Sequence, residues 1–186
     1  MPHILGKRIL LREYRLSDLP ELRKWVNDPL VTEGLSDIFL FPHTQEATEG
    51  FLASLLEGRT ESRDFIVAEN PSEHFLGQIS LQRIDWKNRY AVLSIVFPRE
   101  HQGKGYGTEA LRLLLRFVFD ELGLNRLELL VHDDNAPAIR CYERCGFREE
   151  GRFRQQFFRH GRFQDILVMA ILADEYRRLP EVPEER

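Results

Sequence analysis

Three glycines, each separated by one residue, interrupt the chain at residues 101–108, between an apolar run and a second apolar run typical of a helix. Gly103, Gly105 and Gly107 permit left-handed backbone angles and remove side chains that would keep a ligand away from the main chain. Because a helix is expected to follow directly, the free N–H groups of its first turn and its positive dipole end point to the same place. Lys104 adds a positive charge. The bend therefore predicts a binding site for a phosphate or pyrophosphate group.

Two familiar phosphate loops do not fit this bend. A Walker loop needs Ser or Thr after its Gly-Lys pair, but Gly105 follows Lys104, and Pro98 stands where its first glycine belongs. The dinucleotide fingerprint fails because Thr108 occupies the position of its third glycine. A turn that only connects a strand to a helix is the alternative. The coincidence of strand, glycines, lysine and helix favours the anion site.

Size and composition predict one soluble globular domain. The chain has 186 residues, a net charge of −4 and a pI near 5.9, which argues against a general nucleic-acid binder and suits a cationic substrate. We expect a domain over residues 1–178, a disordered tail over 179–186, no membrane span, no secretion signal and a cytoplasmic location. Cys141 and Cys145 are interpreted as packing residues, and no metal site is predicted.

Hydrophobic periodicity predicts an alternation of strands and helices. Asp18 is expected to cap a first helix in a capping box with Glu21, and Thr44 is expected to cap a second helix that Gly58 ends. Between them, residues 30–42 show no period and either line a substrate groove or only pack. Strands are expected at 8–13, 64–69, 75–85, 90–97, 127–132, 152–158 and 162–172, and a helix at 108–122. The helical crossover makes strands 90–97 and 127–132 parallel.

A second motif lies about thirty residues after the bend, where Asn135, Ala138, Tyr142 and Gly146-Phe147 match the pattern Asn-x-x-Ala-x-x-x-Tyr-x-x-x-Gly-Phe. This pattern resembles the second motif of the GNAT superfamily of N-acetyltransferases. The bend resembles the pyrophosphate loop of the same superfamily, Gln/Arg-x-x-Gly-x-Gly/Ala, through Gln102, Gly105 and Gly107. The resemblance covers about residues 8 to 176. Its last part is most similar to the RimJ/RimL ribosomal-protein branch and to the spermidine acetyltransferases.

The resemblance implies an α+β fold with a mixed, mostly antiparallel sheet of about seven strands, helices on both faces, and a parallel strand pair flanking a cleft for acetyl-CoA. It implies that the pantetheine arm meets backbone groups of Ile95, Val96 and Phe97. It implies that Asn135 holds the cofactor near its thioester, and that Tyr142 is the general acid for the departing thiolate. The pyrophosphate is then expected on Gln102, Gly103, Lys104, Gly105, Tyr106, Gly107 and Thr108.

Alternatives to these roles follow from the residues themselves. Tyr142 could be a packed core aromatic, and Asn135 could be a helix cap, a role compatible with cofactor binding. Many members of the resembling branch carry a glutamate where this chain has Val92, and valine cannot accept a proton. The general base is therefore open among three carboxylates, at Glu33, Asp37 and Asp85, and water leading to bulk solvent.

The acceptor is expected to be a primary amine. A protein N-terminal α-amine has a pKa of ~7.7–8.0 and is partly neutral at pH 7, whereas an alkyl amine near ~10.4 needs a base. The missing carboxylate at Val92 therefore favours the α-amine, with a polyamine or another small-molecule amine as the alternative. A catalytically silent acetyl-CoA-binding interaction module is a third hypothesis. The protein is expected to be a monomer or a homodimer.

Overall fold

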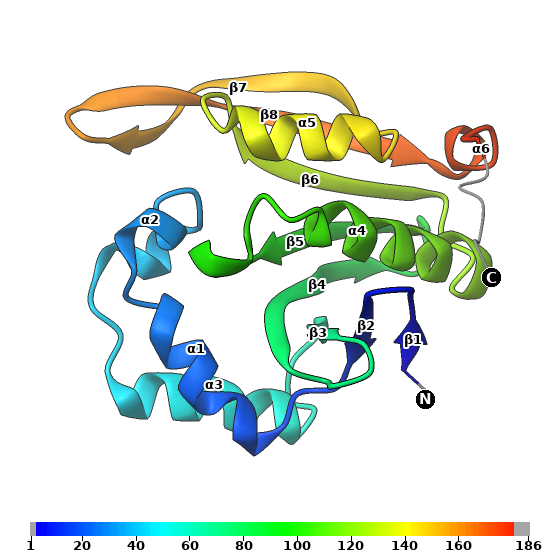
Figure 1. The fold of residues 1–186 in the computed structure, drawn as a ribbon. Helices are drawn as coiled ribbons and strands as arrows, with labels where there is room; N and C mark the ends of the chain where they lie inside the picture. Colours follow the sequence, from blue (N-terminus) through cyan, green and yellow to red (C-terminus); the bar gives the residue numbers. More distant parts are fainter. Residues whose placement is uncertain (1–2, 181–186) are drawn as a thin grey trace.

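The computed structural model describes residues 3–180, which build one mixed sheet of eight strands (Figure 1). In the described part of the chain, neighbouring strands are antiparallel except for β5 and β6, which are parallel. The spatial order is β1-β2-β3-β4-β5-β6-β8-β7. The strands are β1 (Ile4–Leu5), β2 (Ile9–Arg12), β3 (Arg63–Glu69), β4 (Phe75–Asp85), β5 (Tyr90–Val96), β6 (Arg126–His132), β7 (Arg148–Arg159) and β8 (Arg162–Leu172).

The predicted α+β class and the predicted parallel pair are confirmed. The sheet has one strand more than the expected seven because the chain turns at Gly6, whose N–H donates to the carbonyl of Ile9 over 2.9 Å. The short β1 therefore pairs with β2, and the expected strand 8–13 is shortened to Ile9–Arg12.

Helices cover both faces of the sheet (Figure 1). α4 (Tyr106–Arg116) and α5 (Ala136–Arg144) pack on one face and, with it, form a core that we call the α4 core. α1 (Leu19–Trp25) and α3 (Gln45–Leu56) pack on the other face and form a second core, the α1 core. Two short helices, α2 (Pro29–Thr32) and α6 (Ala173–Tyr176), complete the fold. In residues 3–180 we find no helix that is long and apolar enough to span a membrane.

The helix expected at 108–122 begins two residues earlier and changes its winding at its end. After Arg116 the chain makes a π-helical turn over Phe117–Glu121. Three consecutive side chains of this wider turn, Phe117, Val118 and Phe119, are buried in the α4 core.

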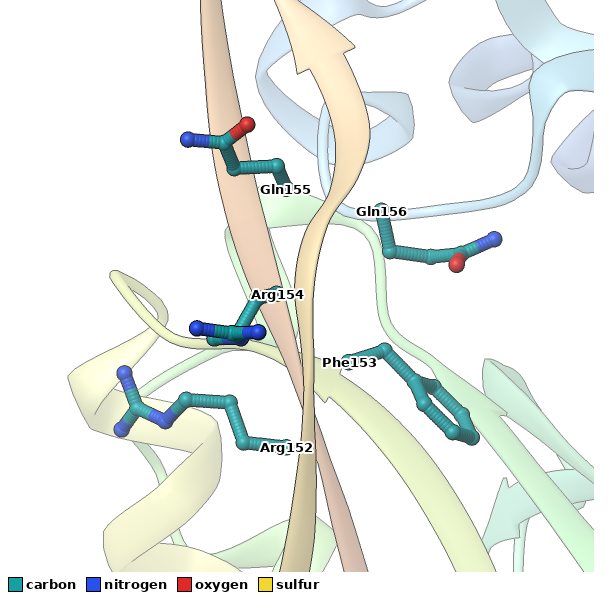
Figure 2. Close-up of a pocket in the computed structure, with 5 residues that line it drawn as sticks. All are labelled: Arg152, Phe153, Arg154, Gln155 and Gln156. Atoms are coloured by element: carbon teal, nitrogen blue, oxygen red, sulfur yellow. The ribbon is translucent and has the colours of Figure 1, made fainter.

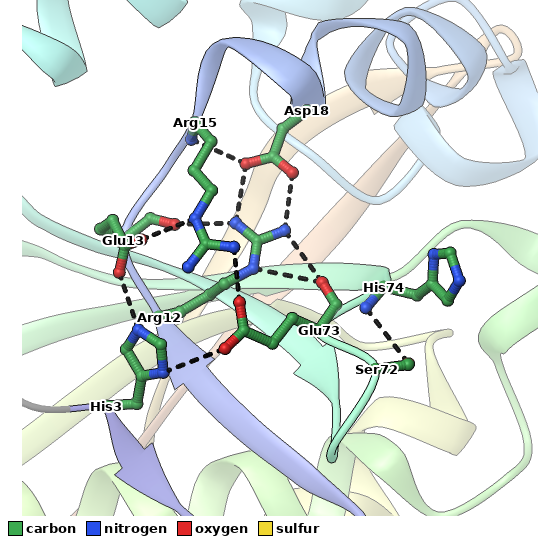
Figure 3. A network of polar contacts seen from close by, with 8 residues as sticks. All are labelled: His3, Arg12, Glu13, Arg15, Asp18, Ser72, Glu73 and His74. Carbon is green, nitrogen blue, oxygen red and sulfur yellow. Dashed lines mark hydrogen bonds and ion pairs between the residues drawn. The ribbon is translucent and has the colours of Figure 1, made fainter.

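Asp18 does not cap α1 as predicted. Its carboxylate accepts hydrogen bonds from both terminal nitrogens of Arg12, over 2.9 and 2.7 Å, and from the backbone N–H of Arg15 (Figure 3). Both side chains of the Arg12–Asp18 pair are buried, and Arg12 also donates to the carbonyl of Glu73 in the β3–β4 turn. An unpaired buried charge costs more free energy than a lost helix cap, so the Asp18 carboxylate pairs with Arg12 and does not cap α1. It joins β2, the start of α1 and the β3–β4 turn.

The other predicted helix ends are confirmed. Thr44 accepts a hydrogen bond from the N–H of Ala47, and Gly58 ends α3 with φ +65°. Either Asp134 or Asn135 is expected to cap α5, and the structure shows that Asn135 does so by accepting from the N–H of Ala138 over 3.2 Å. The expected tail begins with a packed residue, because the side chain of Leu179 joins the α4 core. The remainder of that expectation, residues 181–186, lies outside the described residues.

The parallel strands β5 and β6 pair over a short stretch, and their unpaired ends lie next to the glycine bend. β5 and β6 pair only over Tyr90–Val92 and Arg126–Glu128. Beyond Val92 both strands continue without pairing to each other, as far as Val96 and His132. We call the space between these unpaired ends the strand opening.

Candidate functional site

The glycine bend connects the end of β5 to the start of α4. Gly103 and Gly105 have φ values of +71° and +84°, which favour glycine, and Gly105 is the residue that precedes the first helical residue, Tyr106. Residues 102–105 are exposed. The first-turn N–H groups of α4 therefore begin at an open, side-chain-poor bend, as an anion site requires.

Two side chains brace this bend. Gln102 Nε2 donates to the carbonyl of Phe97 over 2.8 Å and closes the loop between strand and helix. Arg8 donates from Nη1 to the carbonyl of Lys104 over 3.1 Å and from Nε to the Glu109 carboxylate over 2.9 Å. Its guanidinium also lies 5.1 Å from the centre of the Tyr106 ring. Arg8 was missed by sequence reasoning because it lies far away in sequence and carries no local signal.

The second motif lies against the first. Thr108 Oγ1 is 3.3 Å from the Sγ of Cys141 on α5, and a Cβ at Gly107 would lie 3.6 Å from the same sulfur. The hydrogen bond with Cys145 lowers the pKa of the Cys141 thiol. Both cysteines pack between α4 and α5, as predicted, and within residues 3–180 no group of three His, Cys, Asp or Glu side chains could hold a metal ion.

Tyr142 is buried in the α4 core, with 9% of its surface exposed, and meets the ring of Phe147 edge-on at 5.9 Å. Burial raises the pKa of its phenol above the ordinary value, and the thiols of Cys141 and Cys145 act in the same direction. The phenol is therefore protonated at neutral pH and could donate a proton. Packing and proton donation are compatible, so its catalytic role stays a prediction.

The opposite side of the strand opening carries a different set of side chains. His132, at the end of β6, lies edge-on to Phe157 with ring centres 4.2 Å apart. Burial lowers its pKa, the carboxylates of Asp134, Asp133 and Asp37 act to raise it, and Arg159 acts to lower it. Leu130, on the same face of β6, is 57% exposed. Apolar side chains and carboxylates thus lie near His132 together with arginines, because Asp133 pairs with Arg152 and Asp134 with Arg162.

Residues 33–37 lie beside this surface. Glu33 pairs with His160 at the tip of the β7–β8 hairpin, and a Cβ at Gly34 would lie 3.5 Å from the Asn135 amide nitrogen. The structure therefore brings the segment that had no period next to the start of α5 and the hairpin. Asp85 lies elsewhere, because it pairs with Tyr90 at the far end of β5 and binds Asn88.

A separate surface pocket of about 570 Å³ lies at β7, where the strand bulges between Phe153 and Phe157. Figure 2 shows Arg152 and Arg154 on one side of the strand, with Phe153 and Gln156 on the other. The N–H of Gln155 donates to the Asp165 carboxylate over 2.8 Å and stabilises the bulge. None of the predicted cofactor residues lines this pocket.

Comparison with known proteins decides the family. Residues 8–148 match the family described as acetyltransferase (GNAT) domain. The chain belongs to this family. The spermidine N(1)-acetyltransferase of Vibrio cholerae is 37% identical over 114 residues, which are 61% of this chain and 65% of that protein. An N-acetyltransferase of Bacillus licheniformis, p20, is 29% identical over 95% of this chain and 99% of its own length.

A solved structure is similar along nearly the whole fold. The crystal structure of the Vibrio cholerae spermidine N-acetyltransferase in complex with CoA and spermine matches with a TM-score of 0.81 and 27% identity, over 92% of this chain and 99% of that chain. Acetyl-CoA is the co-substrate of this acetyltransferase family. The glycine bend fits its pyrophosphate, because side chains are absent from Gly103 and Gly105, and the strand opening lies directly before this bend.

Proposed function

We propose that this protein transfers the acetyl group of acetyl-CoA to a primary amine of a polyamine such as spermidine. Three carboxylates near His132, at Asp37, Asp133 and Asp134, are compatible with this acceptor class, but Asp133 pairs with Arg152 and Asp134 with Arg162, so their charge is partly neutralised. Polyamines carry several positive charges, so an acidic surface attracts them and raises their local concentration. The observation that carries the acceptor class is the similarity to a spermidine acetyltransferase over most of the chain.

The chain's own residues would hold and orient the co-substrate, and acetyl-CoA supplies the activated thioester. The N–H groups from Gln102 to Thr108 would bind the pyrophosphate, and the backbone at Ile95, Val96 and Phe97 would bind the pantetheine arm. Asn135 would lie near the thioester. Tyr142 would donate its proton near the sulfur, and burial favours this because it keeps the phenol protonated.

A protein N-terminal α-amine is the second candidate acceptor. It is favoured by Val92, which leaves β5 without a proton-accepting side chain at that position, since an α-amine is partly neutral at pH 7. The two acceptors also differ in charge, because a polyamine keeps additional cationic groups after one amine is acetylated.

The test is release of the CoA thiol from acetyl-CoA with spermidine and, separately, with a short peptide that has a free N-terminus and no lysine. We expect a higher kcat/KM with spermidine. Asp37→Asn and Glu33→Gln should raise the KM for spermidine several-fold and leave the KM for acetyl-CoA unchanged, because they remove negative charge from the acceptor side. Preference for the peptide would support the second candidate, and absence of thiol release with every amine would support a silent acetyl-CoA-binding module.

A further inference from the structure

A row of three polar side chains crosses the sheet toward the strand opening. Asp64 on β3 is directly opposite Ser80 on β4, and Ser80 is directly opposite Ser94 on β5. Side chains of directly opposite residues point to the same face of a sheet, with their Cβ atoms roughly 4.5–5.5 Å apart. The three side chains therefore stand side by side across three strands.

The three side chains point to the α1 face of the sheet, where the residues proposed to bind the amine substrate lie. Along β3 and β5 the neighbours two residues away, Ile66 and Val96, belong to the α1 core, whereas Ile79 and Leu93 point to the α4 core. All three polar residues are half-buried. A row of hydroxyls and a carboxyl at positions flanked by buried aliphatic side chains costs desolvation energy, so it needs hydrogen bonds or a function.

Asp64 has partners at one end of this row. Its carboxylate accepts a hydrogen bond from the hydroxyl of Ser62, and the hydroxyl of Ser80 is directly opposite it on β4. Burial raises the pKa of the carboxyl, while these hydroxyls and Arg63 act to lower it. Tyr14 is a further titratable group near it: burial, the Asp64 carboxylate and Asp18 raise the pKa of that phenol, and Arg12 acts to lower it. The raised pKa makes Asp64 a stronger base than a surface aspartate.

Ser94 stands at the other end. Val92 is the last β5 residue that pairs with β6, Leu93 points to the α4 core, and Ser94 is thus the first side chain beyond the pairing that points to the α1 face. It precedes Ile95 to Phe97, the predicted pantetheine strand. The row therefore runs from Asp64 to the edge of the strand opening, where an acceptor amine would meet the thioester.

We propose that Ser94, Ser80 and Asp64 form a proton relay that accepts the proton of the attacking amine. As the amine nitrogen bonds to the acetyl carbon and the carbon–sulfur bond breaks, the nitrogen must lose one proton. The two serine side chains are directly opposite each other, and rotation about their Cα–Cβ bonds would bring the hydroxyls into hydrogen-bond contact. The amine proton would then pass to Ser94 Oγ, the Ser94 hydroxyl proton to Ser80 Oγ, and the Ser80 hydroxyl proton to the Asp64 carboxylate. The leaving sulfur takes its proton from Tyr142, and water returns both residues to their starting states. The relay rests on the proposed function and replaces the carboxylate that Val92 lacks.

In this relay Ser94 touches the substrate and is a catalytic residue, while Ser80 and Asp64 act through it. Ser94→Ala and Asp64→Asn should each lower kcat with spermidine roughly 10²-fold, within the usual contribution of a positioned base. The double variant should be no slower than the slower single variant, because the residues act as one unit. Ser94→Thr keeps the hydroxyl and should retain most of the activity. Ser62→Ala is the matched control, since it removes a hydroxyl partner of Asp64 that lies outside the row.

The pH profile separates the relay from a structural role. Asp64 must be ionised to accept a proton, so below its pKa the slope of log(kcat/KM) against pH should rise from about one, set by the amine, to about two in the wild type. In Asp64→Asn the slope should stay at about one. CoA affinity and melting temperature of Ser94→Ala should match the wild type.

A kcat of Ser94→Ala within about twofold of the wild type would overturn the relay while leaving the acetyltransferase function intact. A kcat of the Ser94→Ala/Asp64→Asn double variant that falls by the product of the two single losses would overturn the relay as well. If Asp64→Asn does not fold, Ser94→Ala and Ser80→Ala still decide, because both keep the carboxylate. Wild-type protein that releases no thiol with spermidine or peptides would refute the proposed function, and the relay with it.

Discussion

The sharpest test of the cofactor site is a pair of alanine substitutions at left-handed glycines. Gly105 has φ +84° at the start of α4, and Gly58 has φ +65° at the end of α3, where an added Cβ would meet no atom within 4 Å beyond its chain neighbours. A left-handed conformation costs an L-residue about 1–2 kcal/mol, and the stiffer unfolded chain of an alanine returns about 0.4–1 kcal/mol. Both variants should therefore lose about 1 kcal/mol of unfolding free energy.

Only Gly105→Ala should also impair CoA binding. Its Cβ would lie 3.2 Å from the Arg8 guanidinium, an exposed and flexible group that can move by a few tenths of an ångström. The same Cβ would keep a pyrophosphate from the backbone N–H groups. Losing one hydrogen bond to a charged group costs about 1.5–3 kcal/mol, which corresponds to a rise of roughly 10- to 100-fold in the Kd for CoA.

Calorimetric titration with CoA and urea unfolding, applied to both variants, measure the two quantities. The expected result is a matched loss of stability and a divergent CoA affinity. Equal CoA affinity in the two variants would refute the assignment of the bend to the pyrophosphate. A large affinity loss in Gly58→Ala would show that backbone strain alone, transmitted through the fold, accounts for the effect.

Three further predictions concern the interior. Tyr142→Phe should lower kcat roughly 10²-fold with unchanged CoA affinity and melting temperature, whereas a purely structural tyrosine would give a lower melting temperature and preserved turnover. Arg12→Ala should cost about 3–5 kcal/mol in urea unfolding, because it leaves Asp18 as a buried, unpaired charge; replacing both residues with apolar ones should cost less. Burial lowers the pKa of His132 below its ordinary 6.5. The unfolded chain therefore binds a proton first, and unfolding free energy should fall as pH drops below about 6.5, less steeply in His132→Gln.

Local signals accounted for the parts of the site that lie close together in sequence. The glycine bend, the strand before it, the helix after it and the Asn135 cap each follow from a few consecutive residues, so spacing alone located them. The assignment to an acetyltransferase family was confirmed for the same reason. The acceptor was ranked less well, because the argument from Val92 favoured an α-amine, whereas the relatives support the polyamine alternative better.

Features that depend on how residues of different strands are paired could not be predicted from the sequence. Asp18 was expected to cap α1, but the side chain of Arg12 on the preceding strand reaches it. Arg8 donates a hydrogen bond to Lys104 in the glycine bend, although the two residues lie 96 positions apart in the sequence. The opposition of Asp64, Ser80 and Ser94 requires knowing which residues of three strands face one another. A one-residue change of register would turn these side chains to the other face, and the bulges at Val67/Ala68 and Leu81/Arg83 that shift the register carry no clear signal in the sequence.

The short pairing of β5 with β6 divides the sheet into two parts, which we call panels, and the three residue pairs between them form the seam. Strands β1 to β5 form one panel, strands β6 to β8 form the other, and three residue pairs join them. A molecule bound in the strand opening would bridge the panels beyond the seam and stiffen the joint. Binding of the co-substrate would therefore also make the sheet more rigid, and hydrogen exchange along the unpaired end of β5 would slow when it binds.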